Sequence, residues 1–255
     1  MNILLTGCRG FIGQNMFDAW KHEHNIIGID IDEEIPSLYG YDLVVHVGGI
    51  SSTTERDVTK LLYYNVDYTI KLAKFCSNYG IKLQVASSAG VYGDSQSFKE
   101  TDLVNPLSPY AWSKAVMEHH LNGFDNVQIF RYFNVYGPHE EHKQNQASPY
   151  FKFRKQLIEQ GHITLFENSF KYKRDFIHVN NLINIQEKFF HLDQVGIWNI
   201  GTGTNKSFYD VAYEVSIETG IPLKVEVIKM PESIAKYYQP YTLADTTKLR
   251  ETLNF

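Results

Sequence analysis

The first thirty residues hold a glycine-rich turn between two short apolar runs, and this arrangement restricts the fold more than any other feature of the chain. The run over residues 2–6 is apolar enough for a buried strand, and Gly7, Gly10 and Gly13 follow it in the order GxxGxxG. A helical pattern comes next, and a second apolar run ends at Asp30. Such a turn brings a pyrophosphate to the amino end of a helix, while the acidic residue accepts a hydrogen bond from a ribose hydroxyl. The sequence therefore predicts a dinucleotide-binding strand–helix–strand unit.

Charged residues beside this turn favour two different cofactors. Asp30, together with Asp32, Glu33 and Glu34, disfavours a 2'-phosphate and favours NAD. Arg9 lies directly before the second glycine, could bind that phosphate, and favours NADP. The residues alone leave the choice between NAD and NADP open.

The middle of the chain alternates apolar runs with helical stretches, which predicts an α/β fold with a Rossmann-like, doubly wound parallel sheet. We expect one long helix over residues 55–79. Only eleven residues separate Asp30 from Asp42, whereas a strand–helix–strand unit needs about thirty. One edge strand of the sheet is therefore predicted to be missing.

The alternation weakens after Pro138, which suggests a division of the chain into two parts. We expect residues 1–137 to form mainly the NAD(P)-binding Rossmann domain. Residues 138–255 would form mainly a small interleaved substrate-binding lobe, with segments that return to the sheet. One strand is expected over residues 174–179.

Bulk properties exclude several classes of function. A net charge of −5 and a pI near 6.1 argue against a nucleic-acid partner. Cys8 and Cys76 have neither metal-ligand nor disulfide spacing, so no metal site is predicted. No signal peptide precedes the first strand and no apolar run approaches eighteen residues. We expect a cytoplasmic protein without a membrane partner.

Tyr110 and Lys114 lie four residues apart in a helical stretch, so they share one helix face. An ammonium group there would lower the pKa of the phenol, and a phenolate can take a proton from an alcohol while a hydride leaves the adjacent carbon. The spacing alone is also compatible with a solvated tyrosine near a lysine. Gly48, Ser88 and Asn134 each follow an apolar run, and ligands of parallel sheets bind beyond the carboxyl ends of the strands.

Five motifs occur in order along the chain, namely TGCRGFIG, SSAGVYG, YAWSK, RYFNVYGP and RDFIHV. Together they resemble those of the extended short-chain dehydrogenase/reductases, the NAD-dependent epimerase/dehydratase family, whose members modify nucleotide sugars. The stretch SSTTERD at residues 51–57 and the run over residues 131–148 are most similar to ADP-L-glycero-D-manno-heptose 6-epimerases. The resemblance implies an isomerase of carbohydrate metabolism that acts on ADP-heptose and serves lipopolysaccharide biosynthesis. It also implies a homo-oligomer.

The mechanism implied by the resemblance is a transient oxidation at C6 of the heptose by NADP or NAD, which is tightly bound and not consumed. Tyr110 would be the first acid/base, and Lys143 would be the second, on the other side of the carbon. Lys114 would bind the nicotinamide ribose and tune Tyr110, and Ser88 would hydrogen-bond the reacting oxygen. From the residues alone, Lys143 could equally be a solvated loop lysine.

The resemblance further implies two sets of binding residues. The cofactor would be bound by Gly7, Arg9, Gly10, Phe11, Ile12, Gly13, Asp30, Ile31, Gly48, Gly49, Asn65, Ser87, Tyr110, Lys114, Val135 and Lys143. The substrate would be bound by Ser51, Asn134, Asn145, Lys152, Phe166, Glu167, Asn168, Ser169, Arg174 and Tyr238. Asn145 and Lys152 replace a serine and a histidine of the heptose epimerases. Arg174 suits a diphosphate, although a salt bridge to Asp175 is an alternative.

Two other functions stay open. A 4-epimerase or a dehydratase of the same family would use the same fold, but a dehydratase would want an acidic residue where Ala89 and Gly90 stand. A non-catalytic dinucleotide-binding protein could lose Tyr110, Lys114 or Ser88, and all three are present.

Overall fold

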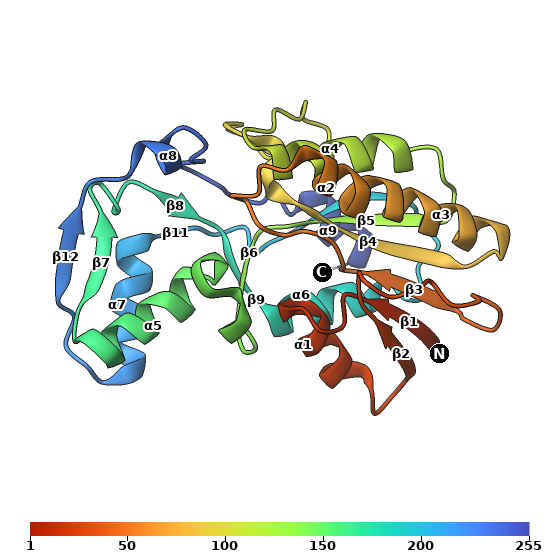
Figure 1. The fold of residues 1–255 in the computed structure, drawn as a ribbon, viewed down its shortest axis with the longest axis horizontal. Coiled ribbons are helices and arrows are strands. Elements are labelled where there is room, and N and C mark those ends of the chain that lie inside the picture. The colour runs from red at the N-terminus through yellow and green to blue at the C-terminus, as the bar shows by residue number, and fades with distance from the viewer. Residues whose placement is uncertain (255) are drawn as a thin grey trace.

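A sheet of six parallel strands lies at the centre of the molecule (Figure 1). This computed structural model describes residues 1–254, except for the side chains of residues 145 and 233. The strand order is β10-β5-β4-β3-β1-β2, and every neighbouring pair is parallel. The strands are β1 (Asn2–Thr6), β2 (Asn25–Ile29), β3 (Leu43–His46), β4 (Lys82–Ser88), β5 (Val127–Tyr132) and β10 (Gly196–Ile200). The predicted Rossmann-like sheet is confirmed.

Helices cover both faces of the sheet. On one face lie α1 (Phe11–Trp20), α6 (Val179–Lys188) and α9 (Thr247–Leu253), and on the other lie α3 (Tyr68–Asn78) and α4 (Pro109–Leu121). Because successive strand side chains point to opposite faces, Ile3 and Leu5 of β1 pack toward α1 and α6, whereas Leu4 packs toward α3 and α4. Both faces are buried, so β1 is an apolar run without alternation.

β2 is an edge strand of the sheet and lies beside β1. Residues 30–42, which follow β2, form neither helix nor strand. They return directly to the start of β3, where Asp42 N donates to Asn2 O at 2.9 Å. Leu38 is buried against the same core as Leu4. The predicted loss of an edge strand is therefore confirmed, and a loop without helix or strand joins β2 to β3.

A second group of elements, which we call the α5–α7 lobe, consists of α5 (Pro149–Gln160), α7 (Phe208–Thr219), β7 (Ile163–Phe166) and β12 (Val225–Ile228). Its apolar centre includes Phe153, Leu157, Ile163 and Val215. The chain passes between lobe and sheet through two small strand pairs, β6 (Asn134–Tyr136) with β9 (Phe176–His178) and β8 (Lys173–Arg174) with β11 (Lys206–Ser207). No helix in the described part of the chain is long and apolar enough to span a bilayer.

Two expected elements differ from the structure. The helix expected over residues 55–79 is α2 (Val58–Leu61), a π-helical turn η1 (Leu62–Asp67) and α3. The strand expected over residues 174–179 is divided at Asp175, because its backbone N donates to Thr242 Oγ1 and the two halves, β8 and β9, pair with different strands. The buried Asp175 carboxylate accepts hydrogen bonds from the backbone of Thr202, Gly203 and Ala244. Three short helices complete the fold, η2 (Ala89–Tyr92), η3 (Glu141–Gln146) and α8 (Glu232–Ala235).

Candidate active site

The glycine-rich turn is packed backbone to backbone. Gly7 has φ +79°, and a Cβ there would lie 2.5 Å from Gly48 N, so the turns after β1 and β3 touch. A Cβ on Gly13 would lie 2.0 Å from Gly7 O, so α1 packs on the turn that leads into it. Gly10 is the N-cap of α1, and within 4 Å a Cβ there would meet only Gly7 O. The amino end of α1 is thus accessible to a phosphate, which its dipole favours.

Asn65 supports the loop after β3 through hydrogen bonds to the backbone of that loop. It is fully buried, its Oδ1 accepts from Ile50 N at 2.7 Å, and its Nδ2 donates to Ile50 O and to Ser113 Oγ. A Cβ on Gly49 would lie 2.7 Å from the same Oδ1. The π-helical turn directs Asn65 inward, so its amide positions the Gly49–Ile50 backbone.

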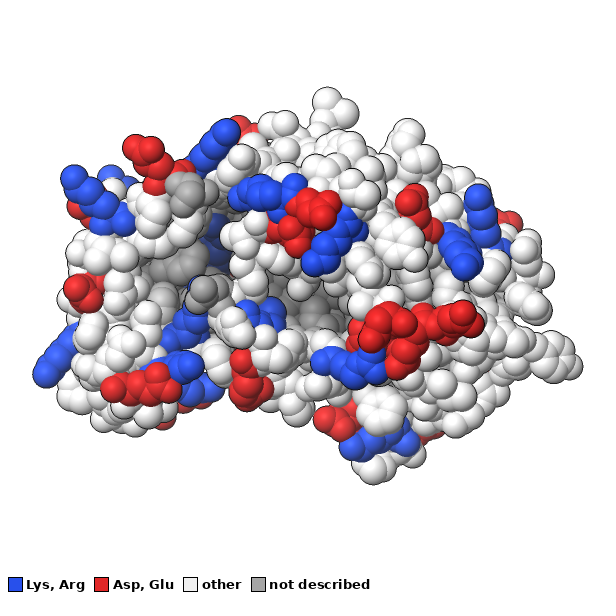
Figure 2. All heavy atoms as spheres, in the orientation of Figure 1, with Lys and Arg blue, Asp and Glu red and all other residues white. Residues whose placement is uncertain are grey.

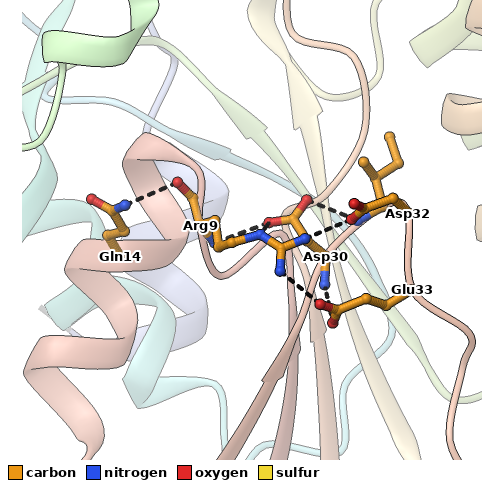
Figure 3. Close-up of polar contacts among 6 residues, drawn as sticks. Arg9, Gln14, Asp30, Asp32 and Glu33 are labelled. Carbon is orange, nitrogen blue, oxygen red and sulfur yellow. Dashed lines mark hydrogen bonds and ion pairs between the residues drawn. The ribbon is translucent and has the colours of Figure 1, made fainter.

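Arg9 is surrounded by carboxylates (Figure 3). Its Nη1 donates to Glu33 and its Nη2 to Asp32, each at 2.6 Å, and its Nε lies 3.8 Å from Asp30. The Arg9 backbone N donates to Asp30 Oδ2, and Ile31 N donates to Asp30 Oδ1. One guanidinium therefore faces three carboxylates, which leaves the region beside the end of β2 negatively charged.

Tyr110 lies in the first turn of α4, which begins at an N-cap on Ser108 and a proline at its first position. The phenol is almost fully buried and is hydrogen-bonded to Ser88 at the carboxyl end of β4. Gly90 N donates to Ser88 Oγ and orients it. Burial raises the pKa of Tyr110, and the hydrogen bond to Ser88 opposes that rise.

Lys114 lies one turn further along α4, on the same face. Its Nζ donates to Ala86 O at 2.9 Å. Burial lowers the pKa of Lys114 to about 8, and the carboxylate of Glu118 opposes this shift. The expected lowering of the Tyr110 pKa by Lys114 does not appear: burial of the phenol raises this pKa, the opposing contribution comes from Ser88, and the Lys114 ammonium donates to β4.

The side chain of Ser87 faces away from the turn. Its Oγ donates to Glu118 Oε1, and Arg131 Nη2 donates to Glu118 Oε2 at 2.6 Å, with all three side chains buried. This network ties α4 to β4 and β5. Only the backbone of Ser87 remains for the cofactor contact that was predicted.

Lys143 reaches the glycine-rich turn from η3. Its Nζ lies 4.7 Å from the centroid of the Phe11 ring and 3.8 Å from Glu140 Oε2. Burial lowers the pKa of Lys143, and Glu140 opposes that shift. The alternative of a solvated loop lysine is excluded, because the side chain is only 20% exposed.

Arg174 is a buried cation without an anionic partner in the described part of the chain. It is 7% exposed, its guanidinium lies 5.0 Å from the Tyr238 ring and 5.6 Å from the Phe208 ring, and its Nη1 donates to Lys173 O. The alternative salt bridge to Asp175 is wrong, because Asp175 is occupied by backbone donors. Burial without a counter-charge lowers the pKa of Arg174, as expected for a site that an anion completes.

The other predicted residues lie in several places. Asn134 Nδ2 donates to Asp175 O and Thr242 Oγ1, and the sequence alone could not assign it this structural contact. Lys152 is half-buried and is influenced by the charges of Glu140 and Lys143. Ile12 and Val135 pack against the core, Ser51 is exposed, and Phe166, Glu167, Asn168 and Ser169 lie at the end of β7 and in the turn after it. The side chain of Asn145 lies outside the described residues.

Sequence reasoning missed two residues of this region, Glu140 and Phe208. Glu140 stands in a polar stretch that looks like a solvated loop, and Phe208 follows a capping serine without any motif. Figure 2 shows a hollow near the middle of one face, with acidic and basic side chains intermixed around it. That face carries no basic patch of the kind that binds nucleic acid.

Three features of this site together define a class of protein: a glycine-rich turn at the amino end of a helix, an acidic residue after β2, and a serine with a tyrosine–lysine pair at the end of β4. They are the parts of a Rossmann-type enzyme that moves a hydride with a nicotinamide dinucleotide. The profile of the NAD dependent epimerase/dehydratase family matches residues 3–201. The chain belongs to this family, as its motifs predicted.

Known relatives cover almost the whole chain. It is 36% identical to the ADP-L-glycero-D-manno-heptose-6-epimerase of Brachyspira hyodysenteriae, over 97% of this chain and 90% of that protein. The fold is similar to that of the Helicobacter pylori ADP-L-glycero-D-manno-heptose-6-epimerase, with a TM-score of 0.90, 22% identity, and coverage of 100% and 90%. It is also similar to the Bacillus cereus UDP-glucuronic acid 4-epimerase solved with UDP-glucuronic acid and NAD, with a TM-score of 0.84, 24% identity, and coverage of 100% and 93%.

Proposed function

We propose that this protein is a nucleotide-sugar epimerase that inverts C6 of an ADP-glycero-manno-heptose. The observation that carries the proposal is the presence of two buried acid/base groups on different elements. Tyr110 extends from α4 to Ser88, and Lys143 extends from η3 to Phe11. A proton-transfer group on each side of one carbon suits the inversion of that carbon. The identity to the Brachyspira relative supports the choice of sugar.

In this proposal each residue has a separate task. Tyr110 takes the proton of the C6 hydroxyl, and Ser88 holds the same oxygen. NAD(P)⁺, when bound at the glycine-rich turn, would supply reversible hydride chemistry at C6, so the reaction needs no net oxidant. Lys114 orients the cofactor ribose, and Lys143 gives a proton to the ketone oxygen as the hydride returns to the other face. Arg174 pairs with the diphosphate as a fork-shaped donor.

The test is turnover of ADP-heptose in deuterated water. We expect inversion at C6 without incorporation of solvent deuterium, and retention of deuterium when it is placed at C6 of the substrate. Solvent label at C6 would contradict hydride return.

Turnover only of another nucleotide sugar would favour a 4-epimerase, for which the replacement of the heptose epimerases' histidine by Lys152 is the motivating observation. Bound cofactor without any turnover would indicate a non-catalytic protein. The predictions of a homo-oligomer, a cytoplasmic location and the division at residue 137 stay predictions.

NAD is the cofactor that the charges beside β2 favour. A 2'-phosphate would have to displace Asp32 and Glu33 from Arg9, in a region where three carboxylates face one guanidinium. After incubation with equal amounts of NAD⁺ and NADP⁺, we expect the protein to retain mainly NAD⁺, as quantified by mass spectrometry. In the double variant Asp32→Asn/Glu33→Gln, the freed Arg9 should raise the relative affinity for NADP⁺ on the order of tenfold.

The matched control is Glu34→Gln, which removes an adjacent charge from a residue that is not among the partners of Arg9. We expect its cofactor ratio to stay near that of the unchanged protein. Preferential retention of NADP⁺ by the unchanged protein would refute the assignment to NAD.

A further inference from the structure

Glu140 is fully buried, and its carboxylate joins the two ends of one loop. Its Oε1 accepts from Gly137 N at 3.2 Å and from Ser148 Oγ at 2.6 Å, and its Oε2 accepts from Ser148 N at 2.5 Å. Ser148 is also the N-cap of α5. One side chain thus connects the residue after β6 to the start of α5.

The loop between these ends has an unfavourable backbone. His139 has φ +68°, and Gln144 has φ +46° with ψ −118°. Such a conformation is strained for a residue that is not glycine, and it persists only when the surrounding structure imposes it. Lys143 lies between these two residues, so the preferred backbone conformations of the loop residues do not determine its position.

The charged groups that face Lys143 come from its own loop and from α5. Its Nζ lies 3.8 Å from Glu140 Oε2, and Lys152 in α5 is influenced by the charges of both Glu140 and Lys143. On the remaining side the Phe11 ring of α1 lies 4.7 Å from Nζ. Two partly buried ammonium groups therefore lie within the electrostatic influence of one carboxylate, and Lys143 is the one that forms an ion pair with it.

We propose that Glu140 is the positioning residue of Lys143: its buried carboxylate fixes the loop over residues 137–148 and holds the Lys143 ammonium against the glycine-rich turn. The inference deepens the proposed function, because it rests on Lys143 as the second acid/base. Glu140 touches neither the reacting carbon nor the cofactor in this scheme. It acts through the loop and through the charge that it presents to Nζ.

The direction of the charge effect follows from the geometry. Burial lowers the pKa of Lys143, and the carboxylate at 3.8 Å counteracts it. Removal of the carboxylate should lower the pKa of Lys143 further, as expected for loss of an opposite charge within ~4–6 Å. Removal of the competing Lys152 ammonium should shift the same pKa upward.

The experiment measures Lys143 directly, by NMR of protein labelled with ¹³C at lysine Cε, with the resonance assigned from the Lys143→Arg variant. In Glu140→Gln we expect the Lys143 resonance to titrate at lower pH and kcat for the proposed epimerisation to fall at least tenfold, with an acid-shifted pH profile. The matched control is Glu141→Gln, an exposed neighbour, for which neither quantity should change.

An unchanged Lys143 titration and kcat in Glu140→Gln would overturn the proposal. If Glu140→Gln does not fold, the Lys143 titration is measured in Lys152→Met instead. An upward shift of the Lys143 pKa in that variant supports the proposal that both lysines are influenced by Glu140, and an unchanged titration contradicts it. Full turnover by Lys143→Met would sink the second-base role alone. The NMR titration would still test the contact between Glu140 and Lys143, so the two failures are distinguishable.

Discussion

Tyr110→Phe is expected to lower kcat by about 10²–10⁴-fold, the range for loss of a positioned acid/base. The ring keeps its packing in the first turn of α4, and only the hydroxyl that is hydrogen-bonded to Ser88 is lost. Cofactor retention and the thermal midpoint should therefore change little. Steady-state turnover, together with mass-spectrometric detection of retained dinucleotide, measures both parts of the prediction.

The control is Tyr79→Phe, which removes a phenol oxygen from a half-exposed residue at the end of α3. It should have the kcat of the unchanged protein. If Tyr110→Phe also kept full turnover, the assignment of Tyr110 as the proton-transfer group would fail, and the hydroxyl of Ser88 would be the next group to test.

Arg174→Met is expected to change ligand affinity and stability in opposite directions. Loss of the guanidinium should weaken the binding of ADP, used as the diphosphate probe, by about 2 kcal/mol or more, roughly thirtyfold. The free energy of unfolding should stay equal or rise by about 1 kcal/mol, because an apolar side chain replaces a buried charge that has no anionic partner in the described structure. Calorimetric titration and denaturant unfolding measure the two effects.

Arg154→Met is the matched control. Arg154 forms an exposed ion pair with Glu218 on the α5–α7 lobe, and such pairs contribute about 0–1 kcal/mol. We expect unchanged ADP binding and a slightly lower stability. A clear loss of stability in Arg174→Met with normal ADP affinity would mean that Arg174 is a structural residue.

Several features of the fold could be predicted from the sequence because they depend on local spacing. The glycines at positions 7 and 13 are required by backbone clearances that a Cβ would violate. The missing edge strand follows from chain length alone, since residues 31–41 cannot form a crossover. The tyrosine–lysine pair needs only helix periodicity.

Other features depend on groups that are distant in the sequence. From the sequence alone, Arg9 is compatible with either NAD or NADP. Its ion pairs with Asp32 and Glu33 form only in the folded protein, where the turn after β1 contacts the loop after β2. The expected strand is divided at Asp175, where the backbone N donates to Thr242 Oγ1 and the carboxylate accepts from backbone donors at Thr202 and Ala244. A hydrophobicity pattern contains no information about such distant donors.

The sequence by itself determined the parallel sheet, its shortened edge, the dinucleotide turn and the family, because these follow from backbone clearance, periodicity and chain length. The tertiary structure decided how each ionisable group is solvated and which partner it has. It placed Tyr110 where burial raises the pKa, left Arg174 without a counter-charge among the described residues, and buried Glu140 next to Lys143. Electrostatic behaviour depends on distance and burial in three dimensions, and neither can be derived from the order of residues along a chain.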